Sequence, residues 1–228
     1  MNKIYTALLV FSVFSGNLSA QTKPEALRDS LAQATHQLAF HPDSIDLRLK
    51  KVAWNIELKQ WEYAKDDLDK VLYIDNKNIA GLFYRAYVNE KLNRFNFARL
   101  DYQNLLILVP GNFEAQLGLA LLNEKDKHKT EAMDQINSLI EQYPDSAEAY
   151  AARGGIEKGR NMLDLAEFDY SKAIEKDPTI TDYWVNRMEL RILLYRKKDA
   201  MADYQELVKM GIHPGALKPF FDRIKKIK

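Results

Sequence analysis

The feature that most constrains this chain is a pattern that repeats every 34 residues. One column of the pattern is alanine throughout, and another is proline with a single asparagine. A constant interval of this size is the signature of a stacked-repeat protein, in which each unit is one small supersecondary element. A lone helix hairpin cannot bury its apolar face, so successive units must stack to form a continuous core. The two columns are Ala64, Ala98, Ala132, Ala166 and Ala200, and Pro42, Asn76, Pro110, Pro144 and Pro178.

The segment 147–178 shows the unit most clearly. It contains two helix-length runs, 148–159 and 164–176, separated by a polar turn and ended by Pro178. The small side chain of Ala166 would let the two helices approach closely, and proline stops the second helix. A further column lies one helical turn beyond the alanines, and its spacing predicts core positions. Its members are Leu68, Tyr102, Ile136, Tyr170 and Tyr204.

This pattern resembles the tetratricopeptide repeat, which has an aromatic residue, then Leu-Gly and Tyr, then Ala-x3-aromatic and a closing proline. The fourth unit matches it best, with Tyr150, Arg153, Gly154, Ala166, Tyr170, Ala173 and Pro178. The resemblance implies an all-α fold, a right-handed superhelical solenoid of antiparallel helix hairpins. It covers residues 45–214 in five units: 45–78, 79–112, 113–146, 147–180 and 181–214.

Single helices are expected at both ends of the repeats. Residues 21–44 contain one amphipathic run that ends in the proline column, which predicts an N-terminal capping helix. Residues 215–228 contain a second such run, with five cations and one carboxylate. We interpret it as a C-terminal capping helix, and docking on a membrane surface through its lysines is the alternative.

Residues 1–20 predict a secretory signal peptide. One lysine precedes an apolar run from Ile4 to Phe14, and small residues surround Ala20. The run is too short to span a bilayer as a mature helix, so we expect cleavage near Ala20 and a periplasmic or secreted protein. The chain has no cysteine, so disulfides and a cysteine-linked lipid anchor are excluded. The repeats must be held by packing alone.

Charged residues recur in pairs between the two helices of a unit. Lys51 is matched with Asp67, and the same interval of 16 residues joins Arg85 to Asp101, Arg153 to Asp169 and Arg187 to Asp203. In the third unit both members change together, to Leu119 and Gln135. Because the charges disappear in pairs, we predict an ion pair inside each unit in preference to a charged recognition stripe.

The sequence offers no catalytic or metal-binding pattern. The histidines are isolated from one another, and the glycines at 154, 155 and 159 lie in a predicted helix with no strand before them, so they do not form a phosphate loop. We therefore expect a non-enzymatic protein without a cofactor or metal. The chain has 33 basic and 32 acidic side chains, which gives no sign of nucleic-acid binding.

Binding is better supported than catalysis. In the family that the chain resembles, ligands lie in a concave groove lined by the first helix of each unit. Transfer of the ligand-facing columns predicts an apolar floor under an acidic edge that includes Glu114, Glu148 and Asp182. The candidate groove residues are Leu49, Phe83, Tyr87, Glu90, Leu117, Leu121, Glu124, Lys158 and Glu189. The alternative, weighted equally, is that the apolar members only pack neighbouring helices together.

Two functions remain open at this stage. The first is an adaptor in a cell-envelope complex. It would bind a peptide or helical segment of another protein, with apolar and some basic character. The second is a self-associating scaffold whose groove is filled by another copy, which makes an oligomer possible. Neither hypothesis requires nucleic acid or stable membrane insertion.

Overall fold

The computed structural model describes residues 23–227. Every regular element in this part of the chain is a helix, and none is a strand, which confirms the predicted all-α fold. The helices are α1 (Lys23–Phe40), α2 (Ile45–Glu57), α3 (Trp61–Ile74), α4 (Ile79–Lys91), α5 (Phe95–Leu108), α6 (Phe113–Lys125), α7 (Lys129–Gln142), α8 (Ala147–Gly159), α9 (Leu163–Lys176), α10 (Thr181–Leu193), α11 (Lys197–Lys209) and α12 (Pro214–Lys226). The predicted signal peptide lies outside the described residues.

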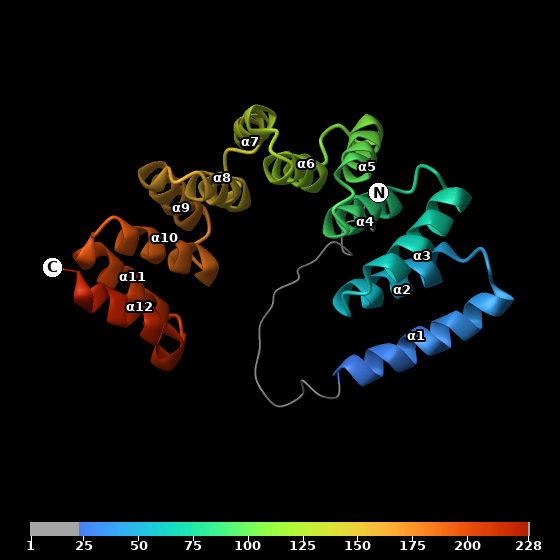
Figure 1. The fold of residues 1–228 in the computed structure, drawn as a ribbon, viewed down its shortest axis with the longest axis horizontal. Coiled ribbons are helices and arrows are strands. Elements are labelled where there is room, and N and C mark those ends of the chain that lie inside the picture. Colours follow the sequence, from blue (N-terminus) through green and yellow to red (C-terminus); the bar gives the residue numbers. More distant parts are fainter. Residues whose placement is uncertain (1–22, 228) are drawn as a thin grey trace. The chain divides into compact units, whose positions relative to one another are not determined.

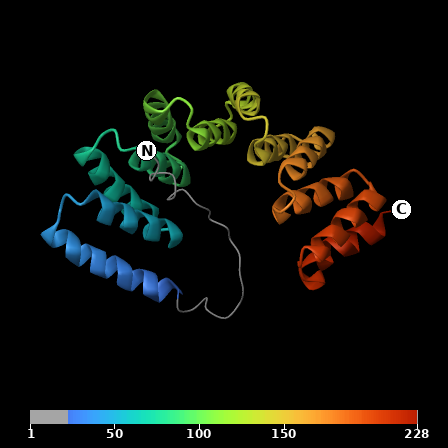
Figure 2. The ribbon, with the colours of Figure 1, turned by 180° about the vertical axis from the view of Figure 1, so that it is seen from behind.

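The described chain divides into two compact units. The first, up to Asn76, contains α1, α2 and α3, and the second, from Lys77, contains α4 to α12. In both units a helix packs against the next one along the chain to form a hairpin, as Figures 1 and 2 show from opposite sides. Within the second unit the last helix of each hairpin also packs against the first helix of the following hairpin. The consecutive helix pairs of a solenoid are thus present.

The first helix of each hairpin starts at a side-chain cap. Ser44, Asn78, Asn112 and Ser146 each accept a hydrogen bond from the backbone N–H three residues later, at 3.4, 2.9, 2.8 and 3.1 Å. Such a cap satisfies one of the backbone donors that a helix start leaves unpaired. In the fifth hairpin Ile180 holds the same position and provides no side-chain cap.

The turn inside each hairpin contains one residue in the left-handed region. These residues have φ between 57° and 65°, and none of them is glycine. The left-handed conformation is unfavourable for residues with a Cβ, so its recurrence shows that helix packing dictates the path of the turn. The five residues are Lys59, Asn93, Lys127, Asn161 and Tyr195.

The alanine column is fully buried where the two helices of a hairpin meet, as predicted. The next column is also core, since Leu68, Tyr102, Ile136 and Tyr170 are buried. Tyr204 differs because it is only half-buried, and its ring lies 5.1 Å from that of Phe221 on α12. The expected core is therefore confirmed at four of its five positions.

The size of the side chain in this core column determines which residue the following helix can carry opposite it. A Cβ added at Gly118 on α6 would lie 2.7 Å from the ring of Tyr102 on α5. One repeat later, the shorter Ile136 stands in the place of Tyr102, and Ala152 stands in the place of Gly118. The large Tyr102 on one helix is thus matched by a glycine, which has no side chain, on the next.

Helices without a hairpin partner of their own cover the two ends of the described chain. α1 packs on α2 through Ala34 and Leu38, while α12 buries Leu217 and Ile224 against α10 and α11. Within residues 23–227 no helix combines the length and the hydropathy needed to cross a membrane.

Candidate functional site

The predicted ion pairs inside the repeats are present. The closest nitrogen–oxygen distances are 3.1 Å for Lys51 and Asp67, 2.8 Å for Arg85 and Asp101, 2.6 Å for Arg153 and Asp169, and 2.7 Å for Arg187 and Asp203. All four aspartates are buried. A buried carboxylate needs a partner that replaces its lost hydration, so in these four hairpins the pair favours one register of the two helices.

Two of the arginines also join neighbouring hairpins. Arg153 holds both Asp169 oxygens on α9, and its remaining nitrogen donates to Asn137 on α7 at 2.9 Å. Arg187 repeats this arrangement with Asp203 on α11 and with the Ser171 hydroxyl on α9 at 3.1 Å. The planar guanidinium can reach both sides because its donors form a fork. Each of these arginines therefore fills the cleft between two successive second helices.

The third repeat replaces the ion pair with a neutral contact. Gln135, at the position of the aspartate, accepts a hydrogen bond from Asn123 at 2.9 Å, and Leu119 is buried. Asn123 belongs to a further buried column, which we did not predict from the sequence. The column recurs at the same interval as Asn55, Asn89, Asn123 and Glu157, and that recurrence was visible in the sequence.

Glu157 is the acidic member of this column. It is only 6% exposed, and its Oε2 has no hydrogen-bond partner in the described chain. Burial, followed by repulsion from Asp169, raises the pKa of Glu157 to about 7, although Arg153 and Arg160 oppose the shift. The fourth repeat thus carries two acidic side chains, Glu157 and Asp169, where the third repeat carries the amides of Asn123 and Gln135.

The candidate binding face is formed by the first helices of the hairpins in the second unit. α6 packs beside both α4 and α8, so equivalent positions on these helices are neighbours. Leu121 of α6 is 40% exposed on this face, whereas Phe83 and Tyr87 of α4 are half-buried. Leu117 is buried in a core cluster with Ile136 and does not reach the surface.

The remaining apolar residue, Leu49, lies half-buried on α2 of the first unit. Phe83 packs edge-on against Tyr102, with ring centroids 6.0 Å apart, and the Lys91 ammonium lies 4.7 Å from the centre of the Tyr87 ring. The predicted floor therefore divides into core residues and a smaller exposed part centred on Leu121.

The charged residues predicted for the groove pair across neighbouring first helices. Glu90 lies 3.2 Å from the Lys125 ammonium, and Glu124 accepts both Nε, at 3.1 Å, and Nη2 of Arg160. Lys158 contacts Glu189 at 2.5 Å, and Glu189 also lies 3.5 Å from Arg223 of α12. These contacts form a ladder of ion pairs along the edge, so its charges are largely neutralised.

A second acidic row on the same helices is not neutralised in this way. Glu114, Glu148 and Asp182 lie in the first turns of α6, α8 and α10, and all three are exposed. Within the described chain none of them forms an ion pair. Partial burial, and then repulsion from Glu114, raises the pKa of Glu148. The row therefore presents a negative edge beside the exposed apolar residue.

No group of three or more His, Asp or Glu side chains in the described part of the chain is arranged to hold a metal ion. The described residues define a helical-repeat protein with an exposed apolar position beside a negative edge.

Comparison with known proteins places this fold in a family. A family model described as tetratricopeptide repeat matches residues 114–146. The chain is 25% identical over 219 residues to the DnaJ homolog subfamily C member 7 homolog of Dictyostelium discoideum, covering 88% of this chain and 41% of that protein. The chain thus spans less than half the length of that relative.

Solved structures agree on the fold. A tetratricopeptide repeat protein from Parabacteroides merdae superimposes with a TM-score of 0.74 at 21% identity, covering 90% of this chain and 80% of that one. YrrB, described as a TPR protein with an unusual peptide-binding site, superimposes with a TM-score of 0.51 at 16% identity, covering 82% and 96%. The described chain thus has the fold of tetratricopeptide repeat proteins, and residues 114–146 match the model of that family.

Proposed function

We propose that this protein is a non-enzymatic adaptor that binds a peptide or helical segment of another protein on the first helices of the second unit. The observation that carries this proposal is Leu121. Leu121 is 40% exposed in the middle of a helix that is otherwise well packed, so it provides an anchor point for an apolar side chain of a partner.

The surroundings of Leu121 favour such a contact. The equivalent position on the next first helix is Gly155, which is exposed, and a Cβ there would meet only the Tyr170 hydroxyl at 3.6 Å. The equivalent position on the preceding first helix is Tyr87, a half-buried aromatic residue. A shallow apolar strip that ends at a glycine can accept a side chain of a partner protein.

The partner's charge follows from the two acidic groups of residues. Glu90, Glu124 and Glu189 are neutralised by ion pairs, so they add little attraction for a cation. Glu114, Glu148 and Asp182 are exposed without such pairs, and they would attract lysine or arginine side chains that flank an apolar anchor. We therefore propose a segment with one or two apolar anchors and basic neighbours.

The proposed setting is a complex of the cell envelope. This part of the proposal rests on residues 1–20, whose composition is that of a secretory signal peptide. The peptide-binding description of YrrB is compatible with a peptide as the ligand of this fold.

Self-association is a second candidate, and α5 supports it. Phe97, Leu100 and Ile107 are exposed on one side of this helix, which is unusual for a surface helix without a partner. A second copy covering this side would make the protein an oligomeric scaffold.

Paired substitutions test the adaptor proposal. The variant Tyr87→Ser/Leu121→Ser changes the proposed face, and Leu165→Ser/Phe168→Ser changes exposed apolar residues on α9 as a matched control. We expect wild type and control to capture the same envelope protein by photo-crosslinking, and the first variant to lose it without a change in urea unfolding. Equal capture by all three would contradict the proposed face. Size-exclusion chromatography over a range of concentrations tests self-association, which predicts a mass that rises with concentration.

A further inference from the structure

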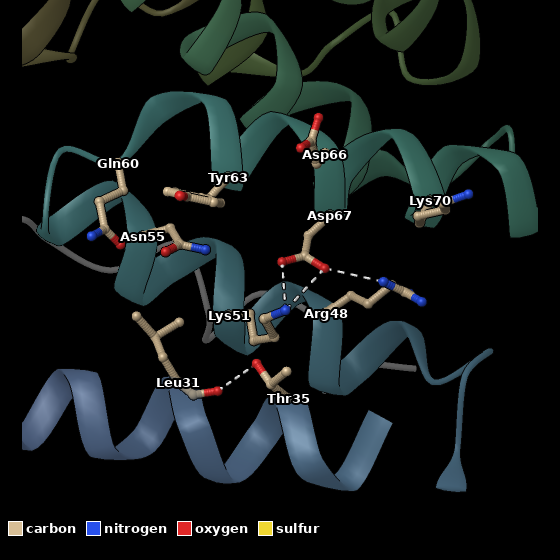
Figure 3. Close-up of a pocket in the computed structure, with 10 residues that line it drawn as sticks. All are labelled: Leu31, Thr35, Arg48, Lys51, Asn55, Gln60, Tyr63, Asp66, Asp67 and Lys70. Carbon is tan, nitrogen blue, oxygen red and sulfur yellow. Dashed lines mark hydrogen bonds and ion pairs between the residues drawn. The ribbon is translucent and has the colours of Figure 1, made fainter. Parts of the chain in front are cut away.

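The first unit contains a cavity that the proposed function does not use. It has a volume of about 480 Å³ and lies between α1, α2 and α3 (Figure 3). This volume lies within the range of small-ligand pockets, roughly 300–1,000 Å³. The side chains that matter are Thr35 from α1, Arg48, Lys51 and Asn55 from α2, and Tyr63 and Asp67 from α3.

A second cavity lies at the same place in the third hairpin, and in both hairpins the repeat position of Arg153 holds a shorter side chain, Lys51 or Leu119. The second cavity, of about 310 Å³, is lined by Gln116, Leu119, Gln135 and Ser138. These residues occupy the repeat positions of Arg48, Lys51, Asp67 and Lys70. In the fourth and fifth hairpins, Arg153 and Arg187 extend across this cleft, as described above. Replacement of that arginine by a shorter side chain therefore leaves the cleft open.

Thr35 shows what the arginine would contact in the first unit. It stands at the repeat position of Asn137 and Ser171, which accept hydrogen bonds from Arg153 and Arg187. Among the described residues the Lys51 ammonium pairs with Asp67 alone, and the Thr35 hydroxyl donates to the Leu31 carbonyl at 2.7 Å instead. Figure 3 shows the gap between these groups. An arginine at position 51 has the length and the second donor needed to close it.

The cavity contains polar groups that the fold leaves without partners. Asn55 is only 3% exposed, yet its side-chain amide makes no hydrogen bond within the described residues. Its counterparts do, since Asn89 donates to Asp101 at 3.4 Å and Asn123 donates to Gln135. The buried Nε of Arg48 is a second donor without an acceptor in the described chain. Buried polar groups are rarely left in this state unless a ligand or water satisfies them.

The charges in the cavity favour an anion. Asp67 is shared by Arg48, at 3.1 Å, and Lys51, also at 3.1 Å, so two cations face one buried carboxylate. The rim adds Lys70 and Asp66, which cancel each other. The net charge of one positive unit, together with the free donors, suits a carboxylate.

We propose that this cavity binds the acidic side chain of an extended peptide, with the carboxylate beside Arg48 and Lys51. The Asn55 amide, which both donates and accepts, then pairs with the peptide group next to that side chain. The Tyr63 ring, 67% exposed at the mouth, covers the aliphatic part of the ligand. This site is separate from the face around Leu121 and takes a ligand of opposite charge, so its test does not depend on the proposed adaptor function.

The test measures binding of N-acetylglutamate N′-methylamide to the full chain by NMR, following the Asn55 side-chain amide. We expect saturable shifts with this probe, and at least tenfold weaker binding of the isosteric glutamine compound. The variant Lys51→Arg keeps the charge but fills the cleft, so it should weaken binding at least tenfold with no loss of thermal stability. The matched control Lys65→Arg, at an ion pair of α3 outside the cavity, should bind as wild type does.

Three results would overturn the proposal. They are binding by Lys51→Arg equal to that of wild type, equal binding of the glutamate and glutamine compounds, and binding of inorganic phosphate as tight as that of the glutamate compound. The last result would identify a general anion site with no preference for a peptide. If Lys51→Arg proves unstable, Tyr63→Ala replaces it, because this exposed residue supports no core; it should weaken binding several-fold, and unchanged binding would count against the site.

Discussion

The third and fourth repeats have the same backbone but are held together differently. In the fourth, Arg153 links Asp169 to Asn137 and fills the cleft between α7 and α9. In the third, Leu119 and Gln135 replace the ion pair, and a cavity of about 310 Å³ remains. The helix bounds and the buried alanine are equivalent in both. The comparison shows that the hairpin does not require the ion pair, and both residues of the pair differ together.

The physical reason is the cost of isolating a buried charge. A buried pair contributes little net stability, whereas one partner left alone loses its hydration without compensation. A repeat can therefore exchange both residues together at small cost, but it cannot exchange one. That exchange leaves an open cleft in the third hairpin, and the shorter Lys51 leaves one in the first.

The largest expected effect comes from introducing into the fourth repeat only one of the two residues that replace the ion pair in the third. Arg153→Leu alone leaves Asp169 buried beside Glu157, and we expect a loss of roughly 3–5 kcal/mol in the free energy of unfolding. The double variant Arg153→Leu/Asp169→Gln reproduces both residues of the third repeat and should recover most of that loss. Urea denaturation measures both values.

The control for this comparison is Lys172→Gln. Lys172 pairs with Glu175 on the surface of the same hairpin, where solvent screens an ion pair and its loss should barely change stability. A double variant no more stable than Arg153→Leu would show that the two repeats differ by more than this pair.

A second difference between the repeats is Glu157 against Asn123. The raised pKa of Glu157 means that the folded chain binds a proton more tightly than the unfolded chain. Its stabilising contribution is therefore complete below about pH 4.5 and is lost as the pH rises through about 7. Glu157→Gln should equal wild type near pH 5 and exceed it by about 1–3 kcal/mol at pH 8, because an amide can donate to Asp169.

Urea denaturation of both proteins from pH 5 to 8 checks this prediction. The control is Glu175→Gln, where the hydrogen bond from Lys172 lowers the pKa of the carboxylate. The contribution of such a group is lost only below its usual pKa, so the difference between this variant and wild type should not change from pH 5 to 8. A difference between Glu157→Gln and wild type that does not change with pH would contradict the assignment.

The smallest effect concerns the matched pair of Tyr102 with Gly118 against Ile136 with Ala152. Gly118→Ala places a methyl group against the buried Tyr102 ring, and we expect a loss of about 1–2 kcal/mol. Adding Tyr102→Ile should remove the clash and reproduce the pairing of the next repeat. As a control, Gly159→Ala has no neighbour within 4 Å and should gain roughly 0.5 kcal/mol from helix propensity. Thermal unfolding ranks the variants, and equal losses at both glycines would contradict the steric explanation.

Much of this fold follows from local periodicity. The alanine column, most of the core column one helical turn beyond it and the ion pairs at an interval of 16 residues were all predictable because each repeat is an internal copy of the others. The candidate site was less predictable. Column position alone could not separate Leu117, which is buried in the core, from Leu121, which is exposed, since both lie on the same helix face.

The ion-pair partners of the charged groove residues could not be predicted from the sequence either. Glu124 was expected to be available at a groove edge, but it is held by Arg160, which lies 36 residues away just after α8. The unpartnered amide of Asn55 likewise depends on three helices meeting around one cavity. Contacts between repeats depend on side-chain reach, and the repeat period contains no information about that.

The sequence by itself determined that this protein is a stack of helix hairpins, because only that architecture satisfies a 34-residue pattern of small, apolar and helix-stopping residues. The tertiary structure alone decided which apolar and charged side chains remain available for binding. Whether a side chain is free depends on the neighbours that packing brings to it, and in this protein those neighbours belong to the adjacent repeat.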